Sequence, residues 1–97
     1  MNIFDYPPTI EEINDWILFP FHFQQFTISF FNNDGEIITV DGDISLVFSG
    51  RELSWMENQK PHKTILDLST PFDKEFIESE SVIVHDMQGC KFLLILK

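Results

Sequence analysis

Residues 21–50 contain three short runs in which aromatic or β-branched residues alternate with polar ones. Two Asp-Gly pairs, Asp34-Gly35 and Asp41-Gly42, separate these runs. Such pairs are common where a tight hairpin turn needs positive φ angles. The pattern therefore predicts a three-stranded antiparallel meander on which the rest of the chain packs.

Downstream of the meander, strand-like runs return. Residues 51–56 and residues 64–68 each predict a strand, and the last two runs flank a turn with Gly89, which predicts a C-terminal hairpin. The final run, residues 92–96, is apolar on both faces, as is typical of a strand in the centre of its sheet. Between these runs, the polar residues 57–62 predict a loop, and residues 71–79 predict a short turn of helix.

A short helix is predicted before the meander. Thr9 and Glu12 match the capping box, in which each side chain binds a backbone N–H of the other residue. Pro20 should end the helix no later than Phe19. One apolar stripe is expected to pack on the sheet, with Trp16 favoured as a core residue over a contact residue: it comprises Ile10, Ile13, Trp16 and Ile17.

These elements predict an α+β fold in a single compact domain of residues 1–97. The expected architecture is one antiparallel sheet of five to six strands, a meander plus a C-terminal hairpin, with the short N-terminal helix packed on one face. A chain of 97 residues is long enough to bury one core and too short for two.

The charge of the chain is strongly negative and unevenly spread. The formal net charge is −10, and residues 1–50 hold eight acids without any Lys or Arg. Such a field repels nucleic acid and anionic membranes, and it speeds the encounter with a basic protein. The alternative is that the charge serves solubility alone. The eight acids are Asp5, Glu11, Glu12, Asp15, Asp34, Glu36, Asp41 and Asp43.

The sequence contains no recognisable catalytic constellation. Cys90 is the single cysteine, and the three histidines fall in different predicted elements, so neither a disulfide nor a metal-ligand spacing is indicated. Nucleotide fingerprints, phosphate-binding loops and Ser-His-Asp motifs are absent from the sequence. We therefore expect a protein without cofactor, metal or enzymatic activity. A start without signal-peptide features and the lack of a long apolar run predict a cytoplasmic protein.

In size, acidity and lack of catalytic residues, the chain resembles the small immunity proteins that neutralise bacterial toxins, and phage proteins that block host nucleases. The resemblance is compositional and covers no defined motif. It implies a binding protein that docks on a basic partner, such as a toxin nuclease, and occludes its active site. An alternative is a structural subunit that self-associates, for example as a homodimer, through the apolar C-terminal strand.

Under the inhibitor reading, the predicted partner-binding residues are acids and one tryptophan. The acids at the predicted meander tips come first, and those of the helix come next. Trp55 borders the polar segment and suits a core role and an interface role equally. The predicted set is Asp34, Glu36, Asp41, Asp43, Glu11, Glu12, Asp15 and Trp55.

Overall fold

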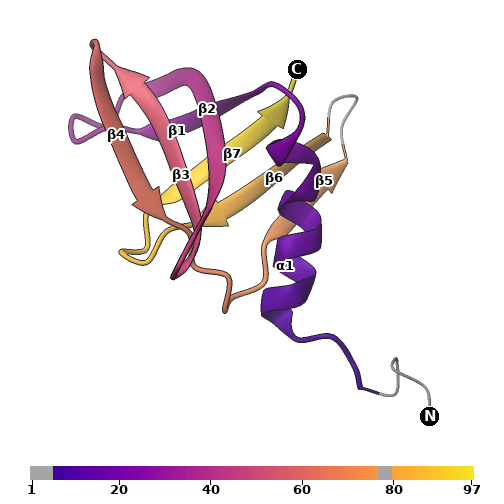
Figure 1. Cartoon of the computed structure of the whole chain (residues 1–97). Coiled ribbons are helices and arrows are strands. Elements are labelled where there is room, and N and C mark those ends of the chain that lie inside the picture. Colours follow the sequence, from indigo (N-terminus) through magenta and orange to yellow (C-terminus); the bar gives the residue numbers. More distant parts are fainter. Residues whose placement is uncertain (1–5, 77–79) are drawn as a thin grey trace.

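The computed structural model of the chain describes residues 6–76 and 80–97. This part contains one α-helix, one short 3-10 helix and seven strands (Figure 1). In chain order they are α1 (Ile10–Leu18), η1 (Phe19–His22), β1 (Phe26–Phe31), β2 (Ile37–Val47), β3 (Gly50–Glu57), β4 (Lys60–Ile65), β5 (Asp73–Phe76), β6 (Glu80–His85) and β7 (Lys91–Leu96).

The strands form one antiparallel sheet in the order β4-β3-β2-β1-β7-β6-β5. This confirms the α+β class, the single antiparallel sheet and the C-terminal hairpin β6–β7. It also confirms that the last run is central, because β7 lies between β1 and β6. The sheet has seven strands where five to six were expected.

Residues 71–79 differ from the predicted structure. The predicted helical turn is instead the strand β5, which pairs with β6 from Asp73↔Ile83 to Phe76↔Glu80, and residues 77–79 lie outside the described part. Pairing with β6 supplies backbone hydrogen bonds at the edge of the sheet, and this tertiary interaction outweighs the local helical spacing.

The segment after β3 also differs from the prediction. Residues 57–62 are not a loop, because the chain turns at Asn58 and Gln59, with φ of 52° and 65°, and β4 begins at Lys60. Both residues adopt the left-handed conformation that a two-residue hairpin turn requires. The result is a β3–β4 hairpin at one edge of the sheet (Figure 1).

Asp41-Gly42 was predicted to be a turn, and this is wrong, because β2 runs through it without interruption. Gly42 is absent from the described residues with positive φ, whereas Gly35 in the first hairpin turn has a φ of 78°. The glycine serves packing instead. A Cβ atom at Gly42 would lie 2.2 Å from Cδ1 of Ile28 and 2.8 Å from Cε2 of Phe26.

Replacing Gly42 with alanine is therefore expected to lower the free energy of unfolding by about 1–3 kcal/mol, the usual cost of overpacking a core. Ile28 is fully buried and has little room to move. Urea unfolding followed by circular dichroism measures the loss. Asp43→Ala, at an exposed position of the same strand, is the control and should stay within about 0.5 kcal/mol. Equal stability of Gly42→Ala and the parent would contradict this packing role.

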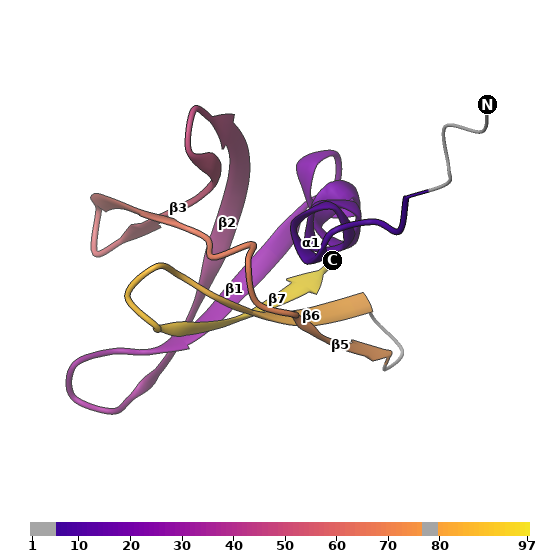
Figure 2. The same ribbon diagram turned by 90° about the horizontal axis from the view of Figure 1, so that it is seen from below.

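The sheet is strongly curved, and α1 lies on its concave side (Figures 1 and 2). Viewed from below, β2 and β3 form one arm, β5–β7 form the other, and α1 lies between them. Backbone contacts join the two arms at one end: Leu66 bridges to Asp86, and the N–H of Asp67 donates to the C=O of His85 at 2.8 Å. The concave face thus encloses the core.

The core consists of the inward side chains of the sheet, the residues after β4, and the end of α1 with η1. Its buried apolar members are Leu18, Phe21, Phe26, Ile28, Ile44, Leu53, Leu66, Leu68, Phe72, Val82, Val84, Phe92, Leu94 and Leu96. Burial of this apolar surface is the main favourable term in folding.

The helix begins and ends as predicted, and of its predicted apolar stripe Ile17 is half-buried and packs against the core. The other three residues of the stripe do not face the core. Thr9 and Glu12 form the capping box, and α1 ends at Leu18. The predicted core role of Trp16 is wrong, because this side chain is 61% exposed, and Ile10 and Ile13 are also exposed. Asn14 and Leu18 are buried instead. Within the described residues, α1 lacks the length and apolar character of a membrane-crossing helix.

Candidate functional site: a groove beside strand β2

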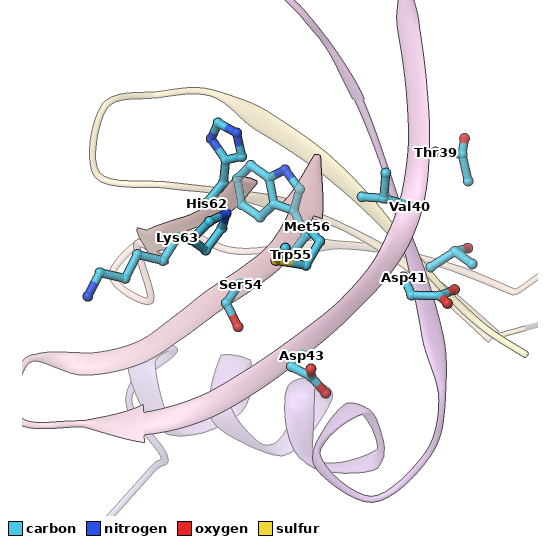
Figure 3. A pocket seen from close by; sticks show the side chains of 11 residues that line it. Thr39, Val40, Asp41, Asp43, Ser54, Trp55, Met56, His62 and Lys63 are labelled. Carbon is cyan, nitrogen blue, oxygen red and sulfur yellow. The ribbon is translucent and has the colours of Figure 1, made fainter. Parts of the chain in front are cut away.

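A groove of about 950 Å³ opens between β2 and the β3–β4 hairpin (Figure 3). This volume is at the upper end of the range of ligand pockets. The groove is lined by Thr27, Thr39, Val40, Asp41, Asp43, Ser54, Trp55, Met56, Pro61, His62 and Lys63.

The groove exists because β3 pairs with only half of β2. The β1–β2 register covers Ile37 to Gly42, whereas the β2–β3 register begins at Gly42 and ends at Val47. Toward the start of β2, beyond Gly42, β3 therefore no longer pairs with β2. We call the backbone of residues 37–40 on the side away from β1 the open edge of β2. Figure 3 shows Val40 on the same side of β2 as Trp55, with Thr39 on the other side.

An aromatic pair forms one wall. The rings of Trp55 and His62 stack with 5.7 Å between centroids and 12° between planes. Trp55 is half-buried, and its ring also contacts Phe30 at 5.2 Å and Phe92 at 5.5 Å. These contacts hold Trp55 in place from the core side. Trp55 thus combines a packing role with a place in the groove.

Two exposed carboxylates lie on the outer side of the groove. Asp41 and Asp43 were predicted to lie at a hairpin tip, and this is wrong. Both residues belong to β2 and are exposed. Oδ1 of Asp41 is 2.5 Å from Nζ of Lys97, and these side chains are 79% and 44% exposed. An ion pair so exposed contributes about 0–1 kcal/mol. A basic group of a partner can therefore replace Lys97. Lys63 adds one positive charge, and it points away from Asp41 and Asp43 (Figure 3).

The other predicted acids lie elsewhere. Asp34 and Glu36 are in the turn between β1 and β2, where Oδ1 of Asn32 accepts the N–H groups of both residues at 2.9 Å. This turn and α1 lie at opposite ends of the molecule in both views (Figures 1 and 2). The eight predicted residues therefore do not form one face.

The helix acids have structural partners or lie open to solvent. Oε1 of Glu12 accepts the N–H of Thr9 at 3.4 Å within the capping box. Asp15 pairs with Arg51 at 2.7 Å, and this pair connects α1 to β3. Glu11 is exposed. Of the predicted set, the groove brings together Asp41, Asp43 and Trp55.

Sequence reasoning missed the contribution of β4. Pro61, His62 and Lys63 line the groove, but the pattern of residues 57–62 predicts a loop there and not a strand. A signal for the hairpin was present. Glu57 and Lys60 pair across the turn, and an asparagine, which tolerates the left-handed conformation, occupies the first turn position.

Two titratable groups with shifted pKa values lie outside the groove. Burial, followed by the nearby Arg51, lowers the pKa of His22, while Asp15 acts in the opposite sense. Hydrogen bonds from the side chain and the backbone N–H of Ser69 lower the pKa of Asp67. Within the described residues, three or more His, Cys, Asp or Glu side chains do not gather in a group suited to a metal ion.

Comparison of the chain with models of protein families, with curated proteins and with solved structures found no match.

Proposed function

We propose that this protein is a non-enzymatic binding protein that docks on a basic protein and neutralises it by occlusion. The partner class is an enzyme with a basic active site, such as a toxin nuclease. The observation that carries the proposal is the charge distribution: residues 1–50 hold eight acids and no Lys or Arg. Complementary charge would set the rate of association, and buried aromatic contacts would set the lifetime of the complex.

The groove supports this proposal because it places both kinds of contact together. Asp41 and Asp43 are exposed on β2, and the Trp55–His62 stack lies beside them. Tryptophan in a packed setting is among the residues that most often dominate binding energy. The same groove residues would thus attract a basic partner and anchor it.

Replacing Asp41 and Asp43 with asparagine is expected to slow association with the partner by about three- to tenfold, because electrostatic steering raises association rates by roughly 10- to 1,000-fold in total. The partner is first retained from an extract of the native source at low salt, then purified. Association rates of the parent and the variant are measured by stopped-flow fluorescence at several salt concentrations. The difference should shrink as salt rises, because salt screens exposed charges.

Asp34→Asn with Glu36→Gln is the matched control, since it removes the same charge from the turn between β1 and β2. This control should slow association less than the groove variant. Equal and salt-independent rates for the parent and the groove variant would contradict docking through the groove acids. The helix acids Glu11, Glu12 and Asp15 would then be replaced next, and unchanged rates for them would leave the charge a role in solubility alone.

A second candidate function, self-association, is favoured by an apolar hollow on the convex face. Phe31 and Ile37 are 70% and 69% exposed, and together with Leu93 and Ile83 they line a hollow of about 350 Å³. A chain that dimerises through this face would sediment as a dimer, and Phe31→Ser would make it a monomer. Sedimentation as a monomer at all concentrations would remove this candidate.

A further inference from the structure

We propose that the groove binds its partner by strand addition: a short extended segment, with basic and apolar residues in alternation, pairs with the open edge of β2. This inference rests on the proposed function and specifies how the partner is recognised. Three observations carry it: the direction of the backbone groups along β2, the position of the groove in the plane of the sheet, and the different chemistry of its two sides.

The hydrogen-bond pattern of the β1–β2 ladder gives the direction of the backbone groups. The N–H of Asn32 donates to the C=O of Glu36 at 2.9 Å, and bonded pairs recur at every second residue of an antiparallel ladder. Ile38 and Val40, which face Phe30 and Ile28, therefore bond with β1. Thr39 lies between these two residues, so its N–H and C=O groups point away from β1.

On that opposite side, Thr39 faces the groove. The β2–β3 register starts only at Gly42, so in the described part of the chain no strand pairs with Thr39 there. An unpaired strand edge is a ready template for pairing with another chain. Recognition by strand addition uses main-chain hydrogen bonds for affinity and side-chain pockets for specificity. Thr39 is thus suited to pair with an incoming extended segment.

The groove lies in the plane of the sheet. It is bordered by side chains from both faces of the same strands: Val40 and Thr39 point to opposite sides of β2 (Figure 3), and neighbouring residues of a strand alternate in this way. Trp55 and Met56 alternate likewise on β3. A hollow that touches both faces of a strand runs along its edge. An incoming strand would therefore extend the ladder that begins with β1 and β2.

The two sides of this groove predict the sequence of the bound segment. The inner side offers Val40 and Trp55, which suit an apolar residue, and the outer side offers Asp41 and Asp43, which suit Lys or Arg. Side chains of an extended segment alternate between the two sides. The exposed Lys97 now paired with Asp41 would give way to a basic residue of the segment.

The test is a titration of the isotopically labelled full chain with blocked synthetic peptides, followed by NMR. The first probe alternates Lys and Val over five residues. The second has the same sequence with N-methyl groups on alternate residues, which keeps the charge and removes backbone donors. We expect the first probe to shift the amide signals of Thr39, Asp41 and Trp55, and N-methylation to weaken its binding about tenfold.

A protein variant provides an independent control. Thr39→Pro removes the N–H that faces the groove but no bond of the β1–β2 ladder, and proline is tolerated at such strand positions. Thr39→Val is the matched control: like Thr39→Pro it removes the hydroxyl that lies 2.8 Å from Ser29 Oγ in a hydrogen bond, but it keeps the backbone N–H. We expect Thr39→Pro, and not Thr39→Val, to weaken binding of the first probe about tenfold.

Two outcomes overturn strand addition: equal binding of the plain and N-methylated peptides, or no shift of groove signals at about 2 mM peptide. The native partner separates this inference from the proposed function. If Asp41→Asn with Asp43→Asn slows association while Thr39→Pro leaves the affinity for the partner unchanged, the function stands and strand addition fails. If neither change affects the partner, strand addition and docking through the groove acids both fail, and the helix acids are tested next.

Discussion

A chain that lacks residues 91–97 is expected to lose cooperative folding altogether. The deletion removes β7, which lies between β1 and β6, and with it the buried side chains Phe92, Leu94 and Leu96. Each of these contributes about 1.5–3 kcal/mol through burial. Their sum, roughly 5–9 kcal/mol, is comparable to the whole stability of a small domain, about 5–15 kcal/mol. The truncated chain should show no thermal transition by circular dichroism.

The deletion also divides the sheet into two parts. Strands β1–β4 and β5–β6 would each expose a new edge, and exposed edges favour aggregation. Removal of Lys97 alone is the control: its exposed ion pair with Asp41 and its backbone bond to Gln25 are peripheral, so the transition should persist. A soluble truncated chain with a cooperative transition would show that β7 is dispensable.

The sequence was informative where the signal is local. The capping box of Thr9 and Glu12 involves residues three positions apart, and the β6–β7 hairpin joins neighbouring segments. Asp34-Gly35 is a turn, as an Asp-Gly pair suggests, because Gly35 has positive φ. Such features depend on few residues, so the pattern determines them without knowledge of the rest of the fold.

Asp41-Gly42 shows why the same signal fails elsewhere. The dipeptide matches the first turn, but the glycine is needed because Ile28 and Phe26 of the neighbouring strand occupy the space of a side chain. That requirement appears only when β1 and β2 are paired. The wrong turn also divided β2 into two strands.

The groove shows the same limit. Asp41, Asp43 and Trp55 were predicted as contact residues, yet the groove itself arises because β3 leaves β2 at Gly42. The register of two strands is a tertiary property that alternation alone does not specify. His62 joins the site only because the β3–β4 hairpin places it opposite Trp55. Composition and charge therefore pointed to residues of the site, but not to its shape.

Replacing Asn14 with leucine is expected to lower the free energy of unfolding by about 2–6 kcal/mol. Asn14 is 1% exposed, and its side chain connects α1 to the segment after β4. Nδ2 donates to the C=O of Leu68 at 2.9 Å and to the C=O of Thr70, and Oδ1 accepts the N–H of Phe72 at 3.2 Å.

Leucine has similar size but would leave these backbone groups without partners. The bonds to Leu68 and Phe72 are buried, and each unsatisfied buried group costs about 1–3 kcal/mol. The predicted apolar stripe of the helix leads to the opposite expectation, because it places Trp16 in the core and does not include Asn14. The comparison of Asn14→Leu with Trp16→Ala therefore tests which face of α1 holds the helix on the sheet.

Trp16 is 61% exposed, so Trp16→Ala should change stability by less than about 1 kcal/mol. Urea unfolding of both variants, followed by far-ultraviolet circular dichroism, makes the comparison without relying on the fluorescence of the replaced tryptophan. A small loss for Asn14→Leu with a large loss for Trp16→Ala would mean that α1 packs through its apolar stripe. The expected order, a large loss at Asn14 and a small one at Trp16, would show that a buried amide and Leu18 orient the helix and leave Trp16 on the surface.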